Sequence, residues 1–118
     1  MLFSYKGYTG EVEVDGEADV LTGEILNIRD VVTFEGDAVH EVKQAFRDSV
    51  DDYLNFCNEL GRKANKPFSG KLAYRTTPER HRQTFMVAKN KGQSLNDWID
   101  ETLTIATEKE GDRTTIVD

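Results

Sequence analysis

The fold of the C-terminal half is determined by residues 69–98, which read SGKLAYRTTPERHRQTFMVAKNKGQSLNDW. The first eight residues of this stretch alternate in character. One side of the expected strand carries Leu72, Tyr74 and Thr76, and the other side carries Lys71, Ala73 and Arg75. Alternation with a period of two predicts a β-strand over residues 69–76.

Two short helices are predicted after this strand. Thr77 and Pro78 predict a helix start, because threonine is a good N-cap and proline at the first helical position loses no helical hydrogen bond. Lys91 and Gly92 predict the end of this helix. Ser94 predicts the N-cap of a second helix. The apolar stripe of that helix has helical spacing and consists of Leu95, Trp98, Ile99, Leu103 and Ala106.

A strand with two short helices is too small to fold as a single copy. An unpaired strand is unstable in water, and about 40 residues are too few to bury a sufficient core. We therefore expect a homodimer, or a higher homo-oligomer, in which two strands pair as an antiparallel ribbon over four helices. The expected dimer core consists of Leu72, Tyr74, Leu95, Trp98, Ile99 and Leu103.

The expected ribbon suits DNA. A two-stranded ribbon fits the major groove and presents alternate side chains to the base edges. Lysine and arginine pair with guanine, alanine leaves room for a thymine methyl group, and a helix N-terminus offers backbone N–H groups to a phosphate. The predicted DNA-binding residues are Lys71, Ala73, Arg75, Ser94, Leu95 and Asn96.

Residues 8–60 predict a separate α+β module. Alternation over residues 8–14, with apolar segments at residues 20–28 and 31–35, predicts an antiparallel β-meander. A long helix is expected to follow, with Asp37 as its N-cap and Leu60 near its end. The apolar stripe of this helix consists of Val39, Val42, Phe46, Val50, Tyr53, Cys57 and Leu60.

Charge is segregated along the chain. Residues 1–60 hold 14 acidic and four basic residues, a net charge of −10. Residues 61–91 hold nine basic residues and one acidic residue, a net charge of +8, and residues 92–118 have a net charge of −5. The overall charge of −7 therefore does not argue against nucleic acid, and the acidic and basic segments are expected to have different partners.

Catalysis and metal binding are not expected. Glu11, Glu13 and Asp15 share one face of a predicted strand, and carboxylates at this spacing can share a divalent metal. Metal-dependent nucleases need carboxylates from several elements, however, and the sequence shows no such convergence. Cys57 lies on the apolar stripe and is expected in the core, and His40 is expected on the surface. We therefore expect no enzyme activity, catalytic residue, metal or cofactor.

The sequence also favours a cytoplasmic protein with no membrane partner. No run of about 18 apolar residues is present, so no membrane-spanning helix is expected. Residues 1–5 have no basic stretch followed by a long apolar segment, so no secretory signal is expected. A single cysteine, Cys57, cannot form an internal disulfide and fits a reducing compartment.

The order of these elements resembles two known families. Strand, Thr77-Pro78-Glu79, helix, residues 92–96 and helix resemble ribbon-helix-helix DNA-binding domains. The chain over residues 5–105 resembles HicB-type antitoxins. Each matching stretch is weak alone, but the ordered set is more specific. The stretches are residues 5–8 (YKGY), 32–36 (VTFEG), 51–54 (DDYL), 66–71 (KPFSGK), 78–81 (PERH) and 94–96 (SLN).

The resemblance implies an antitoxin that binds and blocks a HicA-type ribonuclease toxin, a small basic protein that cleaves mRNA. It also implies that the antitoxin represses its own operon by binding operator DNA. The expected domains are a toxin-binding, partial RNase H-like domain at residues 1–61, a linker at 62–68 and a ribbon-helix-helix domain at 69–106. Residues 107–118 are expected to form a mobile tail, because they are mostly charged and polar.

The chain departs from the family pattern at two positions. The family usually has apolar residues where this chain has Arg80 and Thr84, so the first C-terminal helix relies on Phe85, Val87 and Ala88. Two alternatives to an antitoxin remain open. One is a stand-alone ribbon-helix-helix regulator with an N-terminal domain that senses a ligand or a protein. The other is a nuclease that uses the N-terminal acidic residues.

Overall fold

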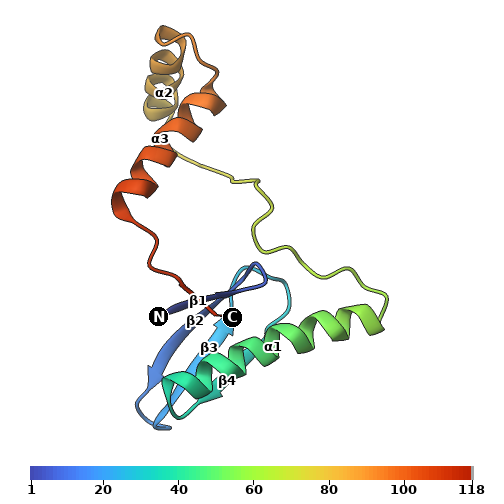
Figure 1. The fold of residues 1–118 in the computed structure, drawn as a ribbon. Coiled ribbons are helices and arrows are strands. Elements are labelled where there is room, and N and C mark those ends of the chain that lie inside the picture. Colours follow the sequence, from blue (N-terminus) through green and yellow to red (C-terminus); the bar gives the residue numbers. More distant parts are fainter. Residues whose placement is uncertain (118) are drawn as a thin grey trace. The chain divides into compact units, whose positions relative to one another are not determined.

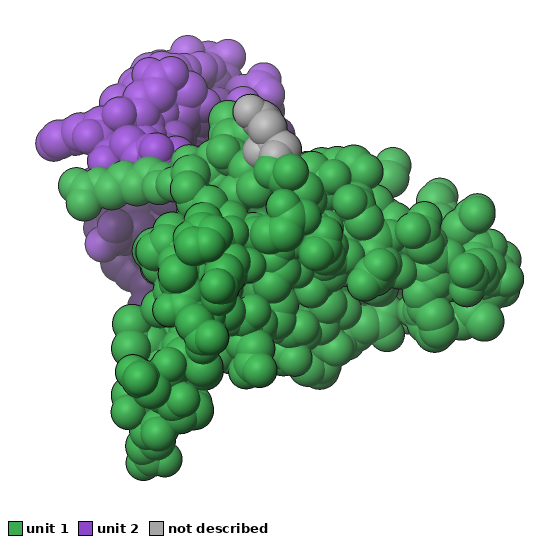
Figure 2. All heavy atoms as spheres, turned by 60° about the horizontal axis from the view of Figure 1, so that its bottom comes forward, with its two compact units in different colours: residues 1–70, 113–118 green, residues 71–112 purple. Residues whose placement is uncertain are grey.

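The computed structural model describes residues 1–117, which form two compact units (Figures 1 and 2). Unit 1 consists of residues 1–70 and the C-terminal segment from residue 113 onward, and unit 2 consists of residues 71–112. Unit 1 contains a five-stranded sheet and one helix, and unit 2 contains two helices. The expected α+β class is therefore confirmed. Among the described residues, no helix is long and apolar enough to cross a membrane.

The sheet of unit 1 is a meander with one added strand (Figure 1). Its strands are β1 (Leu2–Tyr5), β2 (Tyr8–Asp15), β3 (Val20–Ile25), β4 (Thr33–Gly36) and β5 (Thr115–Ile116). The order across the sheet is β4-β3-β2-β1-β5. Strands β1 to β4 pair antiparallel, as expected for the three predicted strands, whereas β5 pairs parallel to β1.

Strand β1 was not predicted. It joins β2 through a two-residue hairpin turn at Lys6 and Gly7, whose φ angles are 51° and 81°. Two successive positive φ angles match the turn type that suits the twist of a hairpin, and glycine adopts this conformation without strain. The sheet is therefore wider on this side than the sequence suggested.

Helix α1 (Val39–Glu59) covers one face of the sheet (Figure 1). The predicted apolar stripe is confirmed in its central part, where five side chains are buried: Val42, Phe46, Val50, Tyr53 and Cys57. The stripe is wrong at its ends, because Val39 and Leu60 are exposed. Asp37 is not the N-cap. Ala38 holds that position, and the backbone N–H of Asp37 donates to Glu41 Oε2 at 2.9 Å.

Two glycines allow the aromatic core to lie close to the sheet. Phe46 from α1 packs against Phe34 from β4, with 5.4 Å between the ring centroids. A Cβ atom on Gly23 would lie 2.4 Å from the Phe34 ring, and one on Gly10 would lie 2.7 Å from the Phe46 ring. The rings thus occupy space that any side chain at these two positions would take.

Gly23→Ala is therefore expected to destabilise unit 1 by about 1–3 kcal/mol, because overpacking displaces rigid neighbours. Urea denaturation of the full chain, followed by circular dichroism, measures this change. Gly16→Ala is the matched control, because no heavy atom lies within 4 Å of its added Cβ. Equal denaturation midpoints for the two variants would contradict the packing described here.

Unit 2 contains α2 (Pro78–Asn90) and α3 (Leu95–Glu110), and both predicted N-caps are confirmed. Thr77 Oγ1 accepts from the Arg80 N–H at 3.1 Å, and Ser94 Oγ accepts from the Asp97 N–H at 3.0 Å. Between the helices, Gly92 has a φ of 69°, as expected for a residue that closes a helix.

Two sequence-based expectations differ from the structure. Residues 69–76 form no strand in the single chain that the structure describes. Residues 107–117 contain regular structure where the sequence predicted a tail without it, because α3 continues to Glu110 and β5 pairs with β1. The N–H of Val117 donates to the Ser4 carbonyl at 2.8 Å, and the Val117 side chain is buried in the core of unit 1. Residue 118 lies outside the described part of the chain.

Candidate functional site

The predicted DNA-binding residues lie in two places in unit 2. Lys71, Ala73 and Arg75 are exposed in the segment that precedes α2. Ser94, Leu95 and Asn96 form the start of α3, where the Ser94 side chain caps the helix. The expected ribbon strand is not formed in the single chain, because residues 69–76 have no strand pairing. Their role in DNA binding therefore stays a prediction.

Unit 2 buries very little of its apolar surface. Ala88 is its one buried apolar residue within the described part of the chain. Among the predicted dimer-core residues, Leu72 and Tyr74 are 80% and 70% exposed, and Leu103 is exposed as well. The others, Leu95, Trp98 and Ile99, are half-buried. Helix α2 also has exposed apolar side chains, namely Phe85, Met86 and Val87.

Unit 1 has an acidic sheet face, defined here as Glu11, Glu13, Glu24 and Glu35. Successive residues of a strand point to opposite faces, and the neighbours of these glutamates face α1. Glu11 and Glu24 lie directly opposite each other in the β2–β3 pair. Like charges in this position destabilise a sheet, so the pairing of Glu11 with Glu24 is electrostatically unfavourable.

The acidic sheet face does not resemble a metal site. No group of three or more histidine, cysteine, aspartate or glutamate side chains within residues 1–117 is placed to hold a metal ion. Asp15 has a structural role, because its Oδ1 accepts from the N–H groups of Glu17 and Ala18 in the β2–β3 turn. His40 is exposed and Cys57 is buried, as expected.

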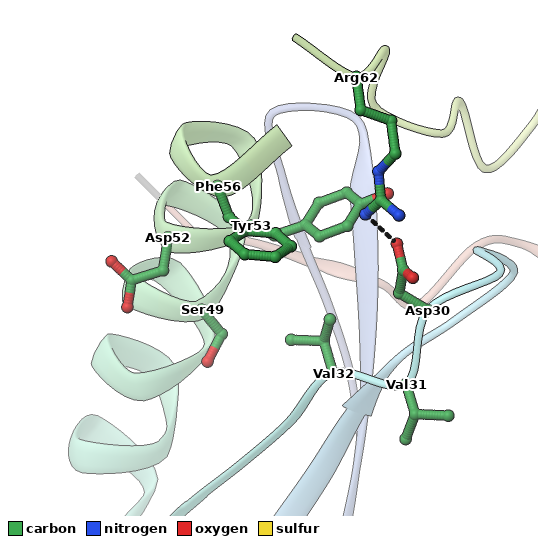
Figure 3. A pocket seen from close by; sticks show the side chains of 8 residues that line it. All are labelled: Asp30, Val31, Val32, Ser49, Asp52, Tyr53, Phe56 and Arg62. Atoms are coloured by element: carbon green, nitrogen blue, oxygen red, sulfur yellow. Dashed lines mark hydrogen bonds and ion pairs between the residues drawn. The ribbon is translucent and has the colours of Figure 1, made fainter. Parts of the chain in front are cut away.

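A groove of about 450 Å³ lies in unit 1 between α1 and the segment before β4 (Figure 3). Val32 points toward the aromatic rings of Tyr53 and Phe56, and Val31 lies at the rim (Figure 3). The complete lining is Asp30, Val31, Val32, Ser49, Asp52, Tyr53, Phe56 and Arg62. This groove was not predicted, because Val31 and Val32 were expected in a strand.

Arg62 closes one end of the groove (Figure 3). Its Nη2 donates to Asp30 Oδ2 at 2.9 Å and to Cys57 Sγ at 3.7 Å. Its guanidinium also lies 5.9 Å from the centre of the Phe56 ring. The thiol of Cys57 and the charge of Asp30 together raise the pKa of Arg62. The charges of Arg62 and Asp30 therefore neutralise each other at this end of the groove.

The predicted linker is anchored on unit 1 through Asn65. The Tyr8 hydroxyl donates to the Asn65 carbonyl at 2.7 Å, and the Asn65 N–H donates to the Tyr53 hydroxyl at 3.2 Å. Burial raises the pKa of Tyr8 and of Tyr53, so both hydroxyl groups remain protonated near neutral pH. Asn27 also donates its side-chain amide to the Pro67 carbonyl. Residues 65–67 thus belong to the surface of unit 1.

The end of α1, the anchored linker and most of unit 2 form one continuous stretch of chain. Residues 53–103 match the model of the HicB family. The HicB family is an antitoxin family whose members are generally non-enzymatic, and the match supports a HicB-type antitoxin. The HicB match covers less than half of the chain and leaves the sheet outside it. Neither curated proteins nor solved structures give a match.

Proposed function

We propose that the chain is a HicB-type antitoxin that blocks a HicA-type ribonuclease toxin and represses its own operon. The observation that carries this proposal is the HicB match together with the division of charge. The acidic residues 1–60 have a net charge of −10, and the adjoining residues 61–91 have a net charge of +8. One surface cannot suit both a basic toxin and DNA, whereas an acidic segment and a separate basic segment can.

Unit 1 is the proposed toxin-binding unit, with a partial RNase H-like fold. Its net negative charge would speed the association with a basic toxin, by roughly 10- to 1,000-fold at low salt. A bound acidic surface would then compete with RNA phosphates for the same toxin cations. In this proposal inhibition is occlusion, which needs no catalytic residue, metal or cofactor in the antitoxin. The site of action is the cytoplasm, where the mRNA substrate lies.

Unit 2 is the proposed ribbon-helix-helix domain, and it functions as a dimer. Leu72 and Tyr74 are exposed, and the stripe of α3 is only partly buried. A second copy of the same unit would cover these side chains. Pairing of residues 71–76 from two copies would form the ribbon. Leu72 and Tyr74 would then face the helices, and Lys71, Ala73 and Arg75 would face the DNA.

The start of α3 would bind a DNA phosphate in this dimer. Ser94 Oγ already accepts from the Asp97 N–H at 3.0 Å, which fixes the first turn. The N–H groups of Leu95 and Asn96 precede the first helical hydrogen bonds and are therefore available to an anion. This contact would position the dimer on DNA but would carry no sequence information.

Arg75→Ala is expected to weaken operator binding by about 1–3 kcal/mol and to relax the preference at one base position, because a bidentate contact with guanine is lost. Ser94→Ala is expected to weaken operator and random DNA alike. Fluorescence anisotropy with both DNAs measures the difference. Equal effects of Arg75→Ala on the two DNAs would show that the ribbon does not read the sequence.

The decisive experiment for the proposed function is co-purification. The full chain carries an affinity tag and is expressed together with the protein encoded beside its gene. We expect a small basic protein to be retained, and we expect the chain to relieve the growth arrest that this protein causes alone. A neighbouring protein that is neither retained nor neutralised would refute the antitoxin role.

A further inference from the structure

The groove between α1 and the segment before β4 gathers exposed apolar side chains of unit 1. Val31 is 81% exposed at its rim, and Phe56 is 53% exposed on its wall. Val32 and Tyr53 form its base (Figure 3). Exposed apolar side chains that gather around a hollow are typical of an interaction site, whereas single exposed ones are ordinary.

The open shape of this groove suits a protein segment better than a small molecule. Sites for small molecules enclose most of the ligand surface, but here the rim residue Val31 and the wall residue Phe56 are largely open to solvent. Such walls leave a small molecule mostly in water. A side chain from a partner surface would instead be covered by the groove on one side and by its own protein on the other.

The charge around the groove determines the chemistry of the partner. Asp30 is paired with Arg62, whereas Asp52 on α1 makes no hydrogen bond or ion pair with any of residues 1–117. Asp48 lies one turn before Asp52 on the same helix. A second copy of this chain would bring like charges together, whereas a lysine or arginine would find an available carboxylate.

We infer that this groove is the toxin-contact site of unit 1. It receives an apolar side chain of the basic toxin against Val32 and Phe56, and a neighbouring cation of the toxin pairs with Asp52. This inference rests on the proposed antitoxin function. It goes further by assigning the contact to the groove and not to the acidic sheet face, which then contributes mainly to long-range attraction.

The first test removes the apolar wall. Full-length Phe56→Ala is compared with Phe68→Ala, which removes an equally large exposed ring of unit 1 that does not line the groove. The probe is the HicA-type protein encoded beside this chain, carrying an inactivating substitution, and calorimetry measures its Kd. We expect Phe56→Ala to raise the Kd by roughly tenfold or more, as for an aromatic contact at the centre of an interface. Phe68→Ala is expected to leave the Kd unchanged.

The second test reverses one charge at the rim. Asp52→Lys is compared with Glu17→Lys, which makes the same change in net charge at the exposed β2–β3 turn. Both variants weaken long-range attraction equally. A contact at Asp52 would add a further loss of roughly tenfold or more, seen mainly as faster dissociation. Thermal unfolding by circular dichroism confirms that all four variants are folded.

Each outcome supports or overturns the inference. Equal Kd values within each pair of variants would overturn the assignment of the groove as the toxin-contact site, but they would leave the proposed antitoxin function intact. A wild-type chain that does not bind the toxin would refute the antitoxin function, and the groove assignment with it. If the groove variants instead reduced the oligomeric state in sedimentation experiments and left the Kd unchanged, the occupant would be a second copy of the chain.

Discussion

Trp98→Ala is expected to convert the proposed dimer into a monomer and to abolish the proposed operator binding. Trp98 lies at the centre of the α3 stripe and is only half-buried in the single chain. In the proposed dimer the remaining surface of the ring would be buried, and loss of a buried aromatic side chain costs about 3–5 kcal/mol. Unit 2 has little other buried apolar surface to compensate for this loss of stability, because Ala88 is its one buried apolar residue within the described chain.

Light scattering at micromolar concentration measures this effect, with 13.4 kDa as the mass of one chain. Thr104→Ala serves as the control, because residue 104 lies on the side of α3 opposite the stripe. Trp98→Phe retains an aromatic ring and should retain a weakened dimer. A wild-type chain that is folded and monomeric under these conditions would show that the dimer proposal is wrong.

Lys71→Ala/Arg75→Ala in the full chain is expected to separate the two proposed functions. Four side chains are removed from each dimer, and each good base contact contributes about 1–3 kcal/mol, so operator affinity should fall by roughly a thousandfold or more. Neutralisation of the toxin should remain, because neither residue belongs to unit 1. Anisotropy with operator DNA and rescue of growth in cells measure the two functions side by side.

Lys63→Ala/Lys66→Ala is the matched control, since it removes the same charge from the linker. If the control lost as much operator affinity, DNA binding would depend on total charge and not on the ribbon. The full chain is preferable to a truncation near Arg62. Such a truncation would lack the hydrogen bonds of Asn65 and the buried side chain of Val117. A loss of toxin rescue by the double variant would show that the toxin also contacts unit 2.

The parts of the fold that could be predicted are those with local signals. The stripe of α1 repeats over several turns, so its centre was identified correctly even though its ends are exposed. Thr77, Ser94 and Gly92 lie where their backbone preferences place them, and the starts of α2 and α3 follow. Caps and periodicity depend on neighbours within one or two turns, which the sequence contains directly.

The parts that could not be predicted depend on distant partners. β5 has two residues, and it pairs with β1, which lies more than a hundred positions earlier. The groove arises where residues 30–32 pack beside α1, and no local pattern indicates such packing. The alternation at residues 69–76 predicts a strand whose partner would be a second chain, so a single chain leaves it without strand pairing.

Because the chain returns to the sheet at β5, unit 2 is connected to unit 1 at both of its ends. The attachment of β5 to the sheet contributes little free energy, since burial of one valine, Val117, contributes only about 1.5–3 kcal/mol. The β5–β1 pairing persists within one chain because the covalent connection gives β5 a high effective concentration at β1. A single protease cut between residues 71 and 76 would remove that advantage and would leave the β5–β1 pairing to hold residues 113–117 on the sheet without a covalent connection. One cut would thus leave the proposed repressor and the proposed toxin inhibitor without a covalent link.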